Sequence, residues 1–210
     1  MRRVHLFELE DLPWFPQAIR DLATDYLEFL EKRFALHEPI VPLLRDALEK
    51  SHATQVVDLC SGGGGPVLRA YEALLAEGIS VPFTLTDKYP NLPAFCGLSE
   101  LHSGGILYVA DSVDATTVPQ DMEGLRTMFN AFHHFAPESA RCVLKCAVEA
   151  GQPIGIFEIP ERSPLTMFPL LFTPIFVAVA TPFIRPFWWR RLLWTYLIRL
   201  VPLTCSLGTD

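Results

Sequence analysis

The sequence predicts an α/β protein with a doubly wound, mostly parallel sheet, and two observations support this. Short β-rich runs alternate with helical patterns between residues 55 and 159, and the first run leads into four consecutive glycines at positions 62–65. Alternating strands and helices indicate a parallel sheet that is covered on both faces. In such a sheet ligands bind at the carboxyl ends of the strands, so the loops at that edge are the candidate site.

The elements follow in order along the chain. Apolar residues recur at helical spacing from Ile19 to Phe34, and Pro39 and Pro42 allow a second amphipathic helix after them. Pro66 and Pro137 each suit the first turn of a helix, and Gly78 suits a helix end. We therefore expect strands at 55–59, 83–87, 106–110, 125–130 and 154–159, with helices at 66–77, 91–101 and 137–151.

The 210 residues are enough for one domain. Within it we expect an N-terminal helical cap at 1–50, an α/β core at 51–161 and an apolar, basic C-terminal helical segment at 162–210. The N-terminus lacks the long apolar run of a signal peptide. The five cysteines form no CxxC pair, which favours buried thiols, no metal and a cytoplasmic location.

Charge is distributed unevenly. The net charge of −7 argues against nucleic acid as a partner. Residues 1–161 contain 12 Lys/Arg and 23 Asp/Glu, whereas residues 162–210 contain five arginines and one acid, Asp210. An acidic body with a basic, apolar tail is typical of a surface that meets anionic lipid or substrate.

The glycine loop after the first strand indicates a nucleoside cofactor. Glycine lets the backbone turn tightly and approach a ligand without a Cβ in the way. The helix that follows offers N–H groups to that ligand. A Walker loop is excluded because no GK[ST] sequence follows the glycines.

The segment Asp58-x-Cys60-x-Gly62-x-Gly64 resembles the acid-x-Gly-x-Gly-x-Gly motif of class I S-adenosylmethionine-dependent methyltransferases, with Cys60 where the first glycine usually stands. Three later segments resemble the family in the same order, and together they span about residues 55–160. The resemblance implies S-adenosyl-L-methionine as cofactor and a Rossmann-like fold. It also implies cofactor-binding roles for a set of residues at these loops: Asp58, Cys60, Ser61, Gly62, Gly63, Gly64, Asp87, Lys88, Asp114, Ala115 and Asn130.

Within that set, the resemblance gives particular roles to two acids. Asp87, in TLTDKYP, stands where the family places an acid on the ribose hydroxyls, and Asp114 stands where an acid accepts from the adenine amino group. Asp111 is an alternative for the adenine contact. The segment from Asn130 to Phe135 resembles the one that faces the methyl acceptor, so His133 or His134 is the candidate catalytic base. Packing beneath the loop is an alternative for both histidines.

Two other functions remain open. A nicotinamide-dependent oxidoreductase would use Cys60-x-Gly62-x-x-Gly65, but it has no use for VDATTVP or NAFHHF. A membrane-associated interaction protein that binds the cofactor but is catalytically impaired is the other alternative. The acids Glu158 and Glu161 end the fifth strand, where they either line the acceptor pocket or serve as caps or solvated side chains.

The C-terminal segment is apolar. Residues 164–184 contain no charge but four prolines, and arginines mixed with tryptophans follow. Buried or substrate-covering helices, interfacial attachment through 164–201 and a membrane span are the alternatives. Family members usually have two further strands, which we expect to be lacking here. A shortened form would have little activity and a tendency to self-associate, and the acceptor expected is small or hydrophobic and lipid-like.

Overall fold

The computed structural model describes residues 14, 16, 29, 39–158, 172–184 and 189–197. The chain separates into two compact units. We call Phe34–Ile159 the sheet unit, and Met1–Arg33 together with Pro160–Asp210 the terminal unit. Most of the helix predicted at 19–34 lies outside the described residues, as do residues 159–171.

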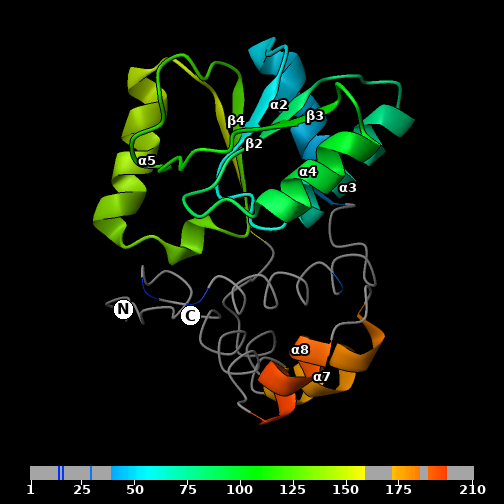
Figure 1. The fold of residues 1–210 in the computed structure, drawn as a ribbon. Coiled ribbons are helices and arrows are strands. Elements are labelled where there is room, and N and C mark those ends of the chain that lie inside the picture. The colour runs from blue at the N-terminus through cyan, green and yellow to red at the C-terminus, as the bar shows by residue number, and fades with distance from the viewer. Residues whose placement is uncertain are drawn as a thin grey trace. The chain divides into compact units, whose positions relative to one another are not determined.

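The sheet unit is built on five parallel strands in the order β3-β2-β1-β4-β5 (Figure 1). The strands are β1 (Val56–Asp58), β2 (Phe83–Leu85), β3 (Ile106–Tyr108), β4 (Leu125–Phe129) and β5 (Ile154–Phe157). β1 pairs with β2 on one side and with β4 on the other, so the strand order reverses there. This is the order of a doubly wound fold, and it confirms the predicted fold class. No described residue after Phe157 forms a strand.

Four helices cover this sheet: α2 (Val41–Ser51), α3 (Gly65–Ala76), α4 (Leu92–Leu101) and α5 (Pro137–Glu149). Each has a proline at its first or second position, where the missing N–H costs no helix bond. Gly78 follows α3 at φ 82°, a left-handed conformation that ends the helix. The prolines and glycines that predicted the helix ends therefore occupy those ends.

The core has two layers because side chains of a strand alternate between the faces of the sheet. On one face Val56 and Phe83 pack with residues of α2, α3 and α4, including Leu44 and Phe95. On the other face Val57 and Met128 pack with Val143 of α5. Figure 1 shows α5 on the opposite side of the sheet from α3 and α4. The carboxyl ends of the five strands stay uncovered by these layers and carry the loops described below.

The described C-terminal part of the terminal unit is helical. It comprises α7 (Thr173–Ala180), η3 (Thr181–Phe183), α8 (Trp189–Leu192) and a π-helical turn, η4 (Leu193–Leu197). Within the residues described, no helix combines the length and the hydropathy needed to cross a bilayer.

Candidate functional site

The glycine loop makes a tight turn from β1 into α3. Cys60, Gly62 and Gly64 have φ values of 61°, 55° and 78°. This left-handed region suits glycine, and other residues are strained there. Cys60 thus adopts the conformation of the glycine that it replaces in the motif. A Cβ on Gly64 would also lie 2.5 Å from Leu98 Cδ1, the end of a flexible side chain that would have to move.

A buried carboxyl group anchors the loop. Asp58 is 1% exposed, and its two oxygens accept hydrogen bonds from Ser61 Oγ and Thr127 Oγ1, both at 2.7 Å. Ser61 Oγ also accepts from the Thr86 N–H at 3.2 Å. These contacts join the loop to β4 and to the end of β2. Sequence reasoning gave Asp58 and Ser61 cofactor contacts, which stay predictions; their geometry holds the loop in place.

Burial governs the ionisation of Asp58. Desolvation and, to a smaller extent, the charge of Asp87 raise the pKa of this carboxyl to about 7. The hydrogen bonds from Ser61 and Thr127 oppose this rise but do not cancel it. A carboxyl group in this range takes up or releases a proton near neutral pH.

Asp87 follows β2 and meets the glycine loop. Its Oδ2 accepts from the Gly62 N–H at 2.9 Å, and its Oδ1 accepts from the Tyr89 N–H at 2.8 Å. A carboxylate offers about four acceptor positions, so each oxygen of Asp87 keeps capacity for a further donor. The side chain is half-buried and within reach of a ligand. The arrangement suits two hydroxyl groups that donate together.

The loop after β3 is tied to the loop after β2. Asp114 Oδ2 lies 2.9 Å from Lys88 Nζ, and Asp114 Oδ1 accepts from the N–H and Oγ1 of Thr116 at 2.9 and 2.6 Å. Burial raises the pKa of Asp114, but the contacts with Thr116 and Lys88 outweigh it and hold the pKa at about 2. Ala115 is buried beside this acid. The structure thus brings Asp87, Lys88 and Asp114 together; Asp111, the alternative adenine residue, is exposed.

The loops after β4 and β5 meet through a histidine and a glutamate. His133, in the short helix η2 (Phe132–His134), has its Nδ1 2.6 Å from Glu158 Oε2. Glu158 Oε1 accepts from the Phe132 N–H at 2.8 Å. The ring of His134 stacks on that of His133, with centroids 4.4 Å apart. Asn130, at φ 50°, begins this segment.

Glu158 is held in its charged form. Partial burial raises its pKa, but the hydrogen bond and charge of His133, together with the N–H groups of Phe132 and His133, outweigh burial and keep the pKa below its ordinary value. Sequence reasoning left this residue between pocket lining and solvation and missed its pairing with His133. The signal was present, because adjacent parallel strands end at the same edge of a sheet. Glu161 lies outside the described residues.

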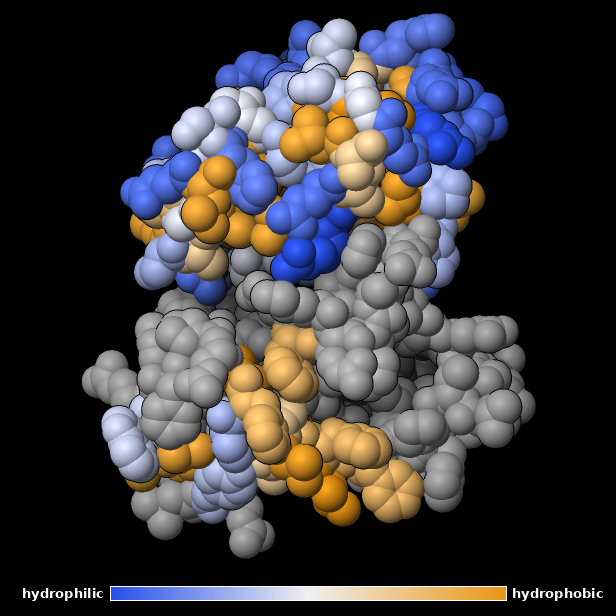
Figure 2. All heavy atoms as spheres, turned by 90° about the vertical axis from the view of Figure 1, so that its right-hand side faces the viewer, coloured by the Kyte–Doolittle hydropathy of each residue, from blue (hydrophilic) through white to orange (hydrophobic). Residues whose placement is uncertain are grey.

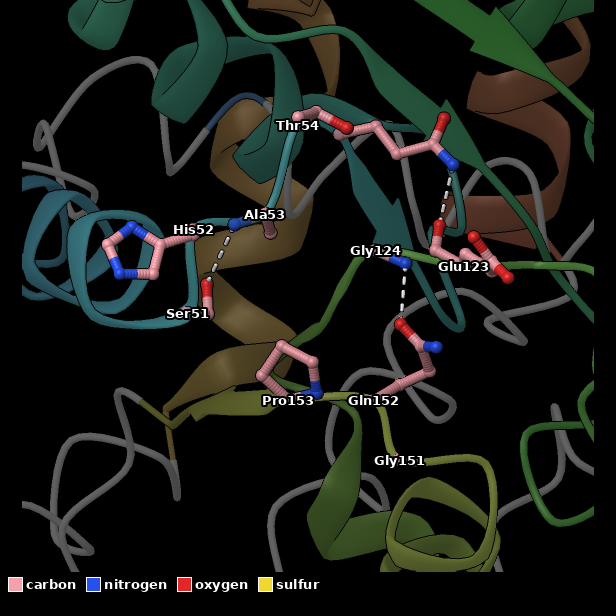
Figure 3. Close-up of a pocket in the computed structure, with 10 residues that line it drawn as sticks. Ser51, His52, Ala53, Thr54, Glu123, Gly124, Gly151, Gln152 and Pro153 are labelled. Atoms are coloured by element: carbon pink, nitrogen blue, oxygen red, sulfur yellow. Dashed lines mark hydrogen bonds between the residues drawn. The ribbon is translucent and has the colours of Figure 1, made fainter.

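A pocket of about 260 Å³ lies at the other edge of the sheet (Figure 3). It is lined by residues 51–55, 123–124 and 151–153, which precede β1, β4 and β5. Two contacts close its wall: the Gln55 side chain donates to the Glu123 carbonyl, and the Gly124 N–H donates to the Gln152 side chain. These bonds pair the side-chain amides of Gln55 and Gln152 with the backbone, and the pocket is separate from the glycine loop. In the described part of the chain, no cluster of His, Cys, Asp and Glu could hold a metal ion.

Comparisons with known proteins give one distant likeness. No family model matches the chain, and no curated protein matches it. One similar solved structure is a superfamily member from Burkholderia thailandensis, described as a "likely methyl transferase", bound to S-adenosyl-homocysteine. The two are 17% identical with a TM-score of 0.32, and the match covers 61% of this chain and 28% of that chain. A likeness this low says nothing about function here.

Proposed function

We propose that the chain is an S-adenosylmethionine-dependent methyltransferase. The carboxylate of Asp87 supports this best, because it is bonded to the glycine loop through Gly62 N–H and keeps acceptor capacity on both oxygens. A ribose with two adjacent hydroxyls fits that donor and acceptor pattern. The N–H groups at the start of α3 would hold the polar end of the same cofactor.

The third loop suits the adenine end of the cofactor. Asp114 is fixed by Thr116 and by Lys88, the neighbour of Asp87. An acid held in this way beside the ribose position would accept from an adenine amino group. A nicotinamide dinucleotide carries the same adenosine, so the binding experiment below decides between the two cofactors.

The residues after β4 and β5 would handle the acceptor. When bound, S-adenosylmethionine supplies an electrophilic methyl group on its sulfonium. His133 would take the proton that a hydroxyl or amine acceptor loses when it is methylated. Glu158 acts on His133, because a carboxylate beside Nδ1 favours the tautomer that carries its proton on Nδ1. In that tautomer Nε2 is the nitrogen that accepts a proton. Glu158 is therefore a positioning residue.

The cofactor assignment is tested by calorimetry of the full chain with S-adenosylhomocysteine and NADH side by side. We expect saturable binding of S-adenosylhomocysteine and none of NADH. Binding of NADH alone would establish the oxidoreductase alternative. Binding of S-adenosylhomocysteine without methyl transfer to any of a panel of small hydrophobic hydroxyl and amine acceptors would favour the impaired interaction protein.

The role of Glu158 is tested by long-range ¹H–¹⁵N NMR of the histidine rings. We expect His133 to show the Nδ1-protonated neutral tautomer, and Glu158→Gln to shift it towards a mixture of tautomers. Glu138→Gln, at an exposed position of α5, is the matched control and should leave His133 unchanged. An unaltered His133 spectrum in Glu158→Gln would contradict the pairing.

A further inference from the structure

The described C-terminal part of the terminal unit folds back on itself. We call residues 172–184 and 189–197 the C-terminal helical pair. Thr181 Oγ1 donates to the Val177 carbonyl at 2.7 Å and lies 3.3 Å from Thr195 Oγ1, and the Tyr196 hydroxyl donates to the Ala178 carbonyl. Val177, Thr181, Ile184 and Thr195 are buried. The inner side of the pair is therefore packed, and its polar groups find partners within the pair.

The outer side of the pair is exposed and apolar. Eight large side chains are between 41% and 77% exposed: Phe172, Ile175, Phe176, Val179, Phe183, Trp189, Leu193 and Tyr196. Figure 2 shows that the described residues of this unit are mostly orange on the face in view. Single exposed apolar residues are ordinary, but a contiguous group within one short stretch marks a surface that meets another apolar body.

The charge of this stretch indicates which kind of apolar surface it meets. Residues 162–209 contain five arginines and no acid, and two of the arginines, Arg190 and Arg191, belong to α8. A second copy of the same stretch would bring five more positive charges and no acid to neutralise them. Phosphate-bearing lipid headgroups instead offer the opposite charge, and tryptophan, tyrosine and phenylalanine suit the depth just below them.

We propose that the C-terminal helical pair docks on the surface of an anionic lipid bilayer. The exposed aromatic and aliphatic side chains enter the interfacial layer, and the arginines of the segment meet the lipid phosphates. α7 has eight residues, far short of the roughly 20 that a span requires, so the pair lies on the bilayer. The proposal does not depend on the cofactor chemistry of the sheet unit.

Vesicle flotation of the full chain tests this proposal. At low salt we expect the protein to float with vesicles of phosphatidylserine and phosphatidylcholine in equal parts, and to bind phosphatidylcholine vesicles much more weakly. Replacing Arg190 and Arg191 with glutamate should weaken binding to the anionic vesicles by about thirtyfold or more. Raising the salt concentration should weaken it as well.

A matched pair of variants separates the docking face from general hydrophobicity. Phe183→Ser with Trp189→Ser removes side chains that are 67% and 77% exposed, whereas Leu101→Ser with Val148→Ser removes side chains that are 77% and 78% exposed on the sheet unit. The first variant should lose flotation and the second should keep it. Both should keep the circular dichroism spectrum and the urea unfolding midpoint of the unmodified chain, which shows that the protein is folded.

Three results would overturn the proposal. The first is no flotation of the unmodified chain with anionic vesicles at low salt. The second is flotation that Phe183→Ser with Trp189→Ser leaves unchanged. The third is a concentration-dependent dimer in sedimentation that disappears in the same variant, with no vesicle binding by either protein. That third result would assign the face to another copy of this chain.

Discussion

The two halves of the carboxyl edge of the sheet are held in different ways. After β1, β2 and β3, the loops bind one another directly: Ser61 joins Asp58 to Thr86, Asp87 holds Gly62, and Lys88 holds Asp114. After β4 and β5, the contact between His133 and Glu158 connects the loops. The first half is thus organised before any ligand arrives, which lowers the entropy cost of binding. The second half depends on one side chain, Glu158, which holds both His133 and the Phe132 N–H, and it should be the easier half to disable.

Asp58 is the residue that joins the halves, and its ionisation gives the largest expected effect. Its folded pKa of about 7 lies above the ordinary value of 3.8, so the folded state holds its proton more tightly than the unfolded state. Stability from this group should therefore fall as pH rises from about 4 to about 7, and then level off. The three-unit difference corresponds to at most about 4 kcal/mol.

Asp58→Asn removes this titration and isolates its effect. We expect the unfolding free energy of the variant minus that of the unmodified chain to increase from pH 4.5 to pH 8, as measured by urea denaturation. Asp121→Asn, at an exposed position, is the control and should show no such trend. A difference between Asp58→Asn and the unmodified chain that is constant with pH would mean that Asp58 ionises normally.

Gly62→Val tests the first half alone. The residue has φ 55°, which a branched side chain tolerates poorly, and its N–H must stay on Asp87. We expect affinity for S-adenosylhomocysteine to fall about a hundredfold or more, or about 2.7 kcal/mol. Gly104→Val is a matched control, because Gly104 has φ 81° and open space around it, so it adds similar strain away from the loop. Equal losses in both variants would indicate general destabilisation.

Much of this site was predictable from sequence, because periodicity and breaker residues report local structure. The strands begin and end within two residues of the expected positions, and the glycines and Asp87 lie at the strand ends where the motif put them. Contacts between distant residues follow less directly. Glu158 and His133 are 25 residues apart, and the predicted strands indicate only that both lie at the same edge of the sheet, not that their side chains pair.

The burial of charged side chains could also not be predicted from the sequence. The run LRTMF reads as a strand, yet Arg126 within it is 0% exposed beneath α5, with its Nη1 3.5 Å from Cys146 Sγ. Periodicity assigns a residue to a face of the sheet but does not reveal how deeply the covering helix buries it. The same holds for Asp58, whose burial lets it anchor the loop, while its contact with a cofactor stays a prediction.

Asp87→Ala tests the first half of the carboxyl edge, as Gly62→Val does, but with a smaller expected effect. The loss of hydrogen bonds to a charged acceptor is worth about 1.5–3 kcal/mol, so S-adenosylhomocysteine should bind about ten- to a hundredfold more weakly. Because Asp87 also holds Gly62 and Tyr89, amide exchange of the glycine loop should quicken. The control Asp121→Ala should change neither. Unchanged affinity in a folded Asp87→Ala protein would refute the ribose assignment.

Cys60 gives the smallest expected effect and shows how far the loop is strained. Its φ of 61° costs a residue with a Cβ about 1–2 kcal/mol, whereas glycine adopts it readily. Comparing Cys60→Gly with Cys60→Ala removes the thiol in both and changes only the Cβ. We expect the glycine variant to be the more stable by about 1 kcal/mol in urea denaturation, because the strain relieved exceeds the extra chain entropy of glycine. If the alanine variant is as stable, the turn is not strained at this position, and the missing glycine of the motif has no energetic consequence.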